Sequence, residues 1–462
     1  MKTHLTWLLG IVAITSAACD STSEQTDDDA TEHPALPDPR VPPDPPVSLG
    51  AESPSFVALN AKPEARGASG SLDRAFGDKG IAITSFDGDV TGLRSLAVLA
   101  NGGIVAVGGG ADDFEIARFA SNGKIDGKTT TSFPTSHTGW TYATSVGVLS
   151  DGRFVVAGNV DLHQIASVRY LADGSIDTTY ATNGRSLTAP FGTDDRISSA
   201  TLDADGRLVG AGYSLSNAYH TLVGRSAASG ALDPSFANGV QPVNPVPTTF
   251  NDFGTGVVVD SFPSIYVSVQ RSDRIDELSV MRLNADGSRA TWWGNGQGIA
   301  TASTPGGGIA QPTAMSLTAQ PGGIYVAGNV AGTTDTWITR IVGSGSPDFS
   351  FGNSGGVITL PKVGTGGDSI SAVAVQADGK VLIAGWTYDG TQRDFLVMRL
   401  LANGSLDTSF GNGGIVVTDI GGSQRMDGAA AIAVAPDGKI IVGGWATGSD
   451  GQKQFALARY WP

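Results

Sequence analysis

Cysteine is nearly absent from this chain, which has one cysteine in 462 residues and therefore cannot form an internal disulfide bond. Charged residues make up only 16% of the sequence, and 44 acidic residues outweigh 29 basic ones, giving a net charge of −15. A protein that grips a phosphate backbone needs clustered Lys and Arg. We therefore expect no nucleic-acid partner.

Sequence motifs for common catalytic chemistry are missing as well. The chain has no G-x-S-x-G nucleophile motif, and its Gly-rich segments at 294–298 and 362–367 lack the context of a phosphate-binding loop. A clustered acid–base pair is not evident either. These absences favour a binding protein over an enzyme and predict no required cofactor, with Ca²⁺ as the one candidate ion.

The first nineteen residues have the pattern of an export signal. Lys2 precedes a mostly apolar run at 5–14, which is too short to span about 30 Å of hydrocarbon, and small residues follow at 16–18. The single cysteine, Cys19, comes directly after them. This placement resembles a bacterial lipobox, which implies that the Cys19 thiol is lipidated. Ordinary cleavage that leaves a free cysteine is the alternative.

Residues 20–69 are predicted to form a disordered tether. They contain nine of the 23 prolines and ten acidic residues against three basic ones. Such a segment cannot bury enough apolar surface to fold, and its like charges extend it. We expect a protein exported to the bacterial envelope, at its periplasmic face or at the cell surface, that touches the membrane only through the N-terminal lipid.

Residues 70–462 contain seven copies of one unit of about 56 residues. The clearest copy reads GSLDTSFGNGGIVVTDI at 404–420, AIAVAPDGKIIVGGW at 431–445 and FALARYWP at 455–462. Two apolar runs joined by a Gly turn indicate a β-hairpin, and two further apolar runs complete four short strands. We predict an all-β fold, a seven-bladed β-propeller of four-stranded antiparallel blades. A β-solenoid is the alternative.

The recurring G-S-L-D-x-S-F-G-x-x-G-I, D-G-K and R-L units resemble the delta-60 repeat, a propeller family of exported bacterial proteins. The resemblance covers residues 70–462 and implies a propeller without an assigned activity.

The order of the predicted strands gives the ring a specific closure. The domain begins with a strand of the outermost type at 81–86 and ends with a strand of the third type at 455–460. We expect the first strand to join the last three and complete the seventh blade, because an open blade would leave an unpaired edge.

An arginine recurs at the end of the third strand of every unit. Eight residues later, five of the first six units have an aspartate, and the exception is Ala290. An ion pair or an Arg-to-backbone bond in each blade is the structural interpretation, and a ring of guanidinium groups around an anion channel is the alternative. The series comprises Arg118, Arg169, Arg225, Arg282, Arg340, Arg399 and Arg459.

Two further positions are candidates for ligand binding. Before the first strand of four units stands an aspartate that either caps nearby backbone N–H groups or contributes to a carboxylate ring for Ca²⁺. At the end of the second strand, three units carry aromatic residues that could stack on a sugar or peptide. The aspartates are Asp195, Asp252, Asp368 and Asp427, and the aromatic residues are Tyr213, Trp386 and Trp445.

These observations predict a non-enzymatic binding or scaffold propeller tethered at the bacterial envelope. Its expected partner is a glycan, a peptide or an envelope protein. An envelope lyase or hydrolase that acts on glycans in the central funnel is the alternative.

Overall fold

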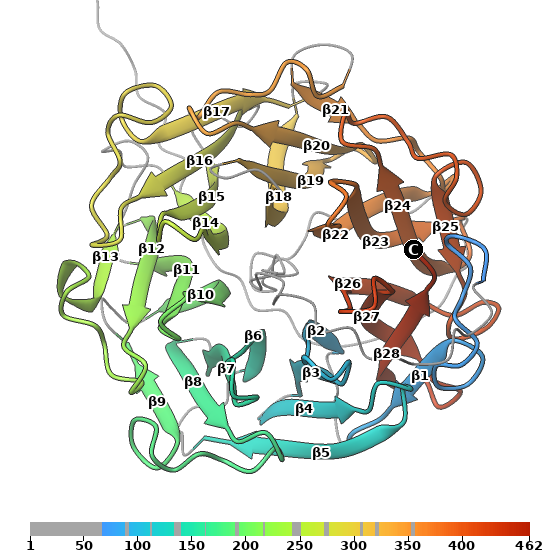
Figure 1. Ribbon diagram of the computed structural model, residues 1–462, viewed down its shortest axis with the longest axis horizontal. Coiled ribbons are helices and arrows are strands. Elements are labelled where there is room, and N and C mark those ends of the chain that lie inside the picture. Colours follow the sequence, from blue (N-terminus) through green and yellow to red (C-terminus); the bar gives the residue numbers. More distant parts are fainter. Residues whose placement is uncertain are drawn as a thin grey trace, which may run out of the picture. The chain divides into compact units, whose positions relative to one another are not determined.

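The predicted repeats form seven four-stranded antiparallel sheets, arranged as blades around a central axis in the computed structural model (Figure 1). The predicted fold class, an all-β seven-bladed propeller, is confirmed. Cys19, the export signal at 1–19 and most of the tether at 20–69 lie outside the described residues. These are 67–87, 92–110, 113–133, 140–161, 163–189, 194–215, 218–242, 251–271, 277–304, 308–318, 323–352 and 356–462.

Blades 1 to 3 each run outward from the axis in chain order (Figure 1). Blade 1 has β2 (Leu93–Val98), β3 (Ile104–Gly109), β4 (Asp113–Phe119) and β5 (Ile125–Ser132). Blade 2 has β6 (Tyr142–Val148), β7 (Phe154–Val160), β8 (Gln164–Tyr170) and β9 (Arg185–Thr188). Blade 3 has β10 (Asp195–Leu202), β11 (Leu208–Leu215), β12 (Tyr219–Ser226) and β13 (Val240–Pro242), with a short 3₁₀ turn η1 (Ala237–Gly239) before β13.

Blades 4 to 6 repeat the same order. Blade 4 has β14 (Asp252–Val259), β15 (Ile265–Arg271), β16 (Glu277–Leu283) and β17 (Ile299–Ser303). Blade 5 has β18 (Ile309–Leu317), β19 (Ile324–Ala331), β20 (Thr336–Ile341) and β21 (Val357–Thr359). Blade 6 has β22 (Gly367–Val375), β23 (Val381–Tyr388), β24 (Arg393–Leu400) and β25 (Ile415–Thr418).

Blade 7 combines the two ends of the domain. Its inner three strands are β26 (Asp427–Val434), β27 (Ile440–Thr447) and β28 (Lys453–Tyr460), and its outer strand is β1 (Ile81–Thr84). β1 pairs antiparallel with β28 from Ile81 opposite Ala458 to Thr84 opposite Phe455. In Figure 1 the blue β1 accordingly lies beside the red β28.

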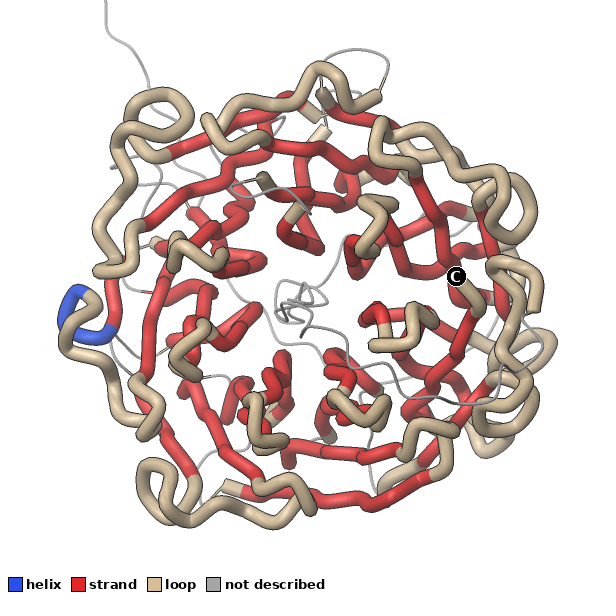
Figure 2. Tube along the Cα trace, viewed as in Figure 1, coloured by secondary structure: helices blue, strands red, loops and turns tan. Residues whose placement is uncertain are grey.

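Each blade has two distinct ends. The hairpin end carries the turns between the first and second strands, such as 435–439, and the segments after the third strand, such as 401–410. The loop end carries the starts of the first strands and the ends of the second strands. The tube in Figure 2 shows the same seven groups of strands joined by loops.

Among the described residues no helix is long and apolar enough to cross a membrane.

The hydrophobic core lies between neighbouring blades. The largest buried cluster joins blade 7 to blades 6 and 1 and includes Leu96, Leu382, Phe410 and Phe455. Phe76, from the segment before β1, is fully buried in this cluster. The N-terminal segment of the domain is therefore part of the core of the last blade.

Candidate functional site

The repeated arginines lie near the ends of the third strands, at the hairpin end of the propeller. The arrangement is nearly the same in five blades. The arginine Nε atom lies 2.7–2.8 Å from an aspartate Oδ2. The guanidinium lies over an aromatic ring, with its Cζ atom 4.5–5.2 Å from the ring centroid. We call this arrangement the arginine clasp. Its Arg–Asp pairs are Arg169–Asp177, Arg225–Asp233, Arg340–Asp348, Arg399–Asp407 and Arg459–Asp73.

The arginine clasp also connects neighbouring blades. Arg169 Nη1 of blade 2 donates to the carbonyl of Ala228 in blade 3 at 2.7 Å, and Arg340 Nη1 of blade 5 donates to Ala402 in blade 6 at 2.8 Å. Arg459 of blade 7 donates in the same way to the carbonyl of Ser121 in blade 1. Because the third strands lie away from the axis, this geometry supports a structural role.

Two blades depart from the arginine clasp. Arg118 pairs with Asp126 at 3.2 Å, but the Asp126 side chain is 57% exposed. In blade 4, Ala290 stands at the aspartate position, and Arg282 Nη2 donates instead to Ser264 Oγ at 2.7 Å. The Arg282 guanidinium lies over Trp292, with Cζ 4.4 Å from the ring centroid. Blade 4 therefore offers a natural comparison without the carboxylate.

The carboxylates of the arginine clasp have lowered pKa values. Hydrogen bonds from the Thr179 hydroxyl and backbone N–H, together with Arg169 and Arg153, lower the pKa of Asp177 against the opposing effect of burial. Burial alone would raise the pKa of Asp407, but hydrogen bonds from Ser409 and the nearby Arg399 outweigh it. These groups are anionic throughout the neutral range.

The four predicted metal-binding aspartates lie at the starts of the first strands of four different blades, and all are buried. Asp368 accepts hydrogen bonds from the N–H groups of Val363 and Gly364 at 2.6 and 3.0 Å. Asp427 accepts from Ile420 and Gly421 at 2.8 and 2.6 Å. These two carboxylates cap backbone groups of the preceding loop, as the first interpretation of the sequence expects. Asp195 and Asp252 occupy the corresponding places in blades 3 and 4.

One carboxylate group among the described residues has the spacing of a metal site. Ligand atoms of Asp394, Asp419 and Asp427 all lie within 4.8 Å of one another. Of the four predicted aspartates, only Asp427 belongs to this group, so the structure does not gather them around one ion. Burial, and secondarily the charge of Asp419, raise the pKa values of Asp394 and Asp427. Oxygen ligands of this kind suit Ca²⁺, although capping bonds already engage Asp427.

The predicted aromatic residues lie at the loop end, and cations already cover the two tryptophan rings. Arg393 lies 4.3 Å from the centre of the Trp386 ring, and Lys453 lies 4.4 Å from that of Trp445. Trp445 also packs against blade 1, because a Cβ built on Gly92 would lie 2.6 Å from the Trp445 Cβ. One face of each ring is therefore occupied, which leaves less surface for stacking than the sequence suggests.

Tyr213 belongs to a larger cluster that the sequence analysis did not find. Its ring contacts Tyr219 and Phe253 edge-on, with centroids 5.5 and 5.2 Å apart. The Arg196 guanidinium lies 5.8 Å from the Tyr213 ring, and the next cation, Arg94, lies 4.4 Å from the ring of Tyr142. We call Arg94, Tyr142, Arg196 and Tyr213 the arginine–tyrosine cluster. It extends over blades 1 to 3 at the loop end.

Neighbouring polar groups hold this cluster in place. Asn159 of blade 2 bonds to both backbone groups of Ile197 in blade 3, accepting at 2.8 Å and donating at 2.9 Å. Arg196 Nε pairs with Asp194 at 2.8 Å. Among the described residues, Arg94 has no hydrogen-bond partner for its buried Nε and Nη1 atoms. One guanidinium of the cluster therefore keeps unused donors.

The tyrosines of the cluster are neutral phenols at neutral pH. Burial raises the pKa of Tyr213 to about 12 although Arg196 opposes the shift. Burial also raises the pKa of Tyr142 against the effect of Arg94 and Arg196. The cluster therefore combines two guanidinium groups with neutral phenols, and the Asp194 carboxylate balances the charge of Arg196.

The comparisons with known proteins agree with this architecture. A family described as a domain of unknown function (DUF5122) beta-propeller matches residues 376–410 and 435–462. These segments contain the D-G-K turns and the repeated arginines of blades 6 and 7. The resemblance to the delta-60 repeat family is confirmed by this match to the repeats of blades 6 and 7. No curated protein matches the chain.

Solved structures match the fold at low sequence identity. Hydrazine synthase from Kuenenia stuttgartiensis is 11% identical with a TM-score of 0.49, and the match covers 80% of this chain and 97% of that one. Virginiamycin B lyase from Staphylococcus aureus is 12% identical with a TM-score of 0.47, over 82% and 99% of the two chains. The polysaccharide lyase Uly1 is 11% identical with a TM-score of 0.45, over 86% and 97%. These similarities concern the fold alone.

Proposed function

We propose that this propeller is a non-enzymatic binding module of the bacterial envelope that recognises an anionic glycan at the arginine–tyrosine cluster. The observation that carries the proposal is the Arg94 guanidinium, whose Nε and Nη1 donors have no hydrogen-bond partner among the described residues. A buried donor without a partner destabilises the folded chain, and a ligand acceptor that reaches it would offset this cost.

The chemistry of the cluster favours a carboxylate- or sulfate-bearing sugar. A guanidinium presents its donors in a planar fork that matches such groups, and tyrosine supplies an aromatic face together with a hydroxyl. Arg94, Tyr142 and Arg196 lie at the starts of first strands, which are the strands nearest the axis (Figure 1), and Tyr213 lies at the end of the adjacent second strand β11. An acidic peptide offers the same charge with a different shape and is an outcome of the test.

The predicted export signal and tether complete the proposal. Lipid attached to Cys19 would hold the chain at the membrane, and the acidic, Pro-rich segment at 20–69 would separate the propeller from it. The propeller would then meet glycans at the periplasmic face or at the cell surface.

A glycan array tests the proposal. It should contain uronic-acid and sulfated oligosaccharides, their neutral counterparts, peptidoglycan fragments and acidic peptides. We expect binding to the anionic sugars that Arg94→Ala abolishes and that Arg153→Ala, at the hairpin end, leaves unchanged. Equal binding of neutral sugars, or unchanged binding by Arg94→Ala, would contradict the proposal. Cleavage of a bound glycan would favour the enzyme alternative.

A further inference from the structure

Blade 3 lacks one pair of side chains that every other blade has. At the middle of the second and third strands, Gly210 stands directly opposite Gly224. The equivalent cross-strand pairs in the other blades carry side chains throughout. They are Ala106–Ala117, Val156–Val168, Val267–Met281, Val326–Thr339, Ile383–Met398 and Val442–Ala458.

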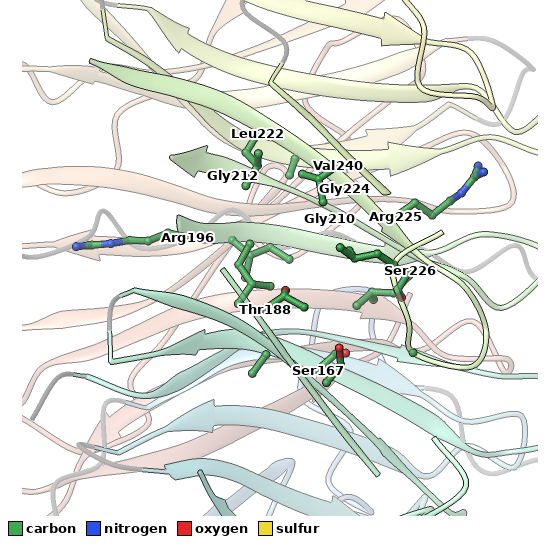
Figure 3. A pocket seen from close by; sticks show the side chains of 18 residues that line it. Ser167, Thr188, Arg196, Gly210, Gly212, Leu222, Gly224, Arg225, Ser226 and Val240 are labelled. Carbon is green, nitrogen blue, oxygen red and sulfur yellow. The ribbon is translucent and has the colours of Figure 1, made fainter. Parts of the chain in front are cut away.

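A cavity lies over this glycine pair, between blades 2 and 3. About 560 Å³ of space there is free of protein atoms, and this figure includes solvent at the open side of the cavity. Gly210 and Gly224 are both partly exposed there, whereas the corresponding residues of the second strand in the other blades are buried. Figure 3 shows Gly210, Gly212 and Gly224 on the blade 3 side, with Ser167 and Thr188 of blade 2 across from them. The missing side chains therefore open a slot between two sheets.

The backbone does not require glycine at either position. Neither Gly210 nor Gly224 has a positive φ. A Cβ on Gly224 would lie 3.3 Å from the nearest atom, Val240 Cγ2, and a Cβ on Gly210 would meet only the flexible end of Ile197 closely, at 2.5 Å. Side chains could be accommodated with small shifts, so the slot reflects the choice of residues rather than strain in the chain.

The walls of the slot are apolar and carry no inward charge. Ile165, Ile197, Leu208 and Leu222 line it. Arg196 and Arg225 also line the slot, but their side chains point away from it (Figure 3). Both guanidinium groups have partners elsewhere, since Arg196 pairs with Asp194 and Arg225 with Asp233. A largely apolar cavity without an inward charge favours an uncharged apolar ligand.

We propose that this slot is a binding site for an uncharged aliphatic chain. The space corresponds to the one that two apolar side chains fill in blade 6, the branched alkyl chain of Ile383 and the unbranched thioether of Met398. An alkyl segment of that combined size would replace the missing packing contacts and cover the exposed glycine backbone. The backbone of Arg196 borders both this slot and the arginine–tyrosine cluster, but the proposal does not depend on glycan binding.

Titration of the full-length chain with 1-octanol in a calorimeter tests this site. We expect saturable binding of one molecule, accompanied by a higher melting temperature. Gly224→Val and Gly210→Val place in blade 3 the kind of side chain that other blades have, so each should weaken binding at least about tenfold, or roughly 1.4 kcal/mol. Gly224→Ala adds a single methyl group, is the mildest of the three changes, and should weaken binding less.

Met398→Leu is the matched control, because it changes the equivalent position in blade 6 with little change in volume. It should bind 1-octanol like the unmodified chain. Absence of saturable binding to the unmodified chain would overturn the proposal. So would unchanged affinity in Gly224→Ala or in a valine variant that still melts cooperatively, because the ligand would then occupy another place.

Discussion

Arg459 in the last strand forms an ion pair with Asp73, which lies 386 residues earlier in the chain, with an Nε–Oδ2 distance of 2.8 Å. In other blades the same pair joins residues eight positions apart, as in Arg399–Asp407. The first G-S-L-D segment of the domain thus takes the place of the turn that would follow β28. Lys439 Nζ, 3.0 Å from the same Asp73 carboxylate, strengthens this contact.

The arginine clasp should contribute measurably to stability. We expect Arg399→Ala and Arg459→Ala to lower the free energy of unfolding by about 1–3 kcal/mol, because each removes the guanidinium hydrogen bond to a buried aspartate. Arg282→Ala is the control, because Ala290 stands at the aspartate position of blade 4 and the change therefore leaves no carboxylate without its arginine. Urea unfolding measures all three variants. Equal losses in all three would show that the Arg–Asp contact adds nothing.

Acid should destabilise the propeller through the same carboxylates. The pKa values of Asp73, Asp177, Asp233, Asp348 and Asp407 are all lowered in the folded chain. Their stabilising contribution is therefore complete above the unfolded pKa, near 3.8, and is lost as the pH falls through the lower folded values. Urea unfolding from pH 7 to pH 2 should show this loss. Asp407→Asn should be less stable at pH 7 and less sensitive to acid, and an unchanged acid profile would contradict the assignment.

Glu115 should produce the opposite dependence at higher pH. This residue of β4 is only 3% exposed, and burial, together with Asp113, raises its pKa to about 8. A raised folded pKa means that the folded chain retains a proton that the unfolded chain releases. Stability should therefore fall between about pH 4.5 and pH 8, by no more than about 1.4 kcal/mol per pH unit.

Melting temperatures of Glu115→Gln across this range test the role of Glu115. The variant should lose the decline with pH, whereas Asp335→Asn, at an exposed carboxylate, should keep it. A parallel decline in Glu115→Gln and the unmodified chain would rule out Glu115 as its source.

The repeats explain why so much of the fold could be predicted from the sequence. Pairs such as Arg399 and Asp407 recur at one spacing because the blades pack against one another in the same way. The aromatic residue over the guanidinium, such as Phe410, recurs with them. The Asp73 partner was missed because it precedes Arg459 by almost the whole domain, although its G-S-L-D context matched the other turns.

The loop-end cluster could not be predicted in the same way. Arg94, Tyr142 and Arg196 come from three blades and occupy positions whose residue types differ from blade to blade. Arg94 also lies at an irregularity of β2, where the pairing register shifts between Leu93 and Ser95. The first strand of every blade has the same shift, which turns the side chain at this position away from the regular alternation of a strand. The Gly210–Gly224 pair, in contrast, could have been found by aligning the seven units.

Lipid attachment is tested by Cys19→Ser. If Cys19 carries the lipid, the variant should move from the membrane fraction to the soluble fraction, while its melting temperature stays unchanged because Cys19 precedes the repeats at 70–462. Fractionation followed by immunoblotting measures the partition. An unchanged membrane fraction would remove the lipoprotein prediction.

The pairing of β1 with β28 is tested most directly by calorimetric melting of two deletion variants. Removal of 70–88 takes away Asp73, Phe76 and β1 together, which exposes the edge of β28 and opens the buried cluster of blade 7. We expect this variant to aggregate or to melt without a cooperative transition, since a bare strand edge and an opened core both favour association. Removal of 20–60 should leave the melting transition unchanged. Cooperative melting of the chain without 70–88 at the original temperature would contradict closure of the ring by its N-terminal strand.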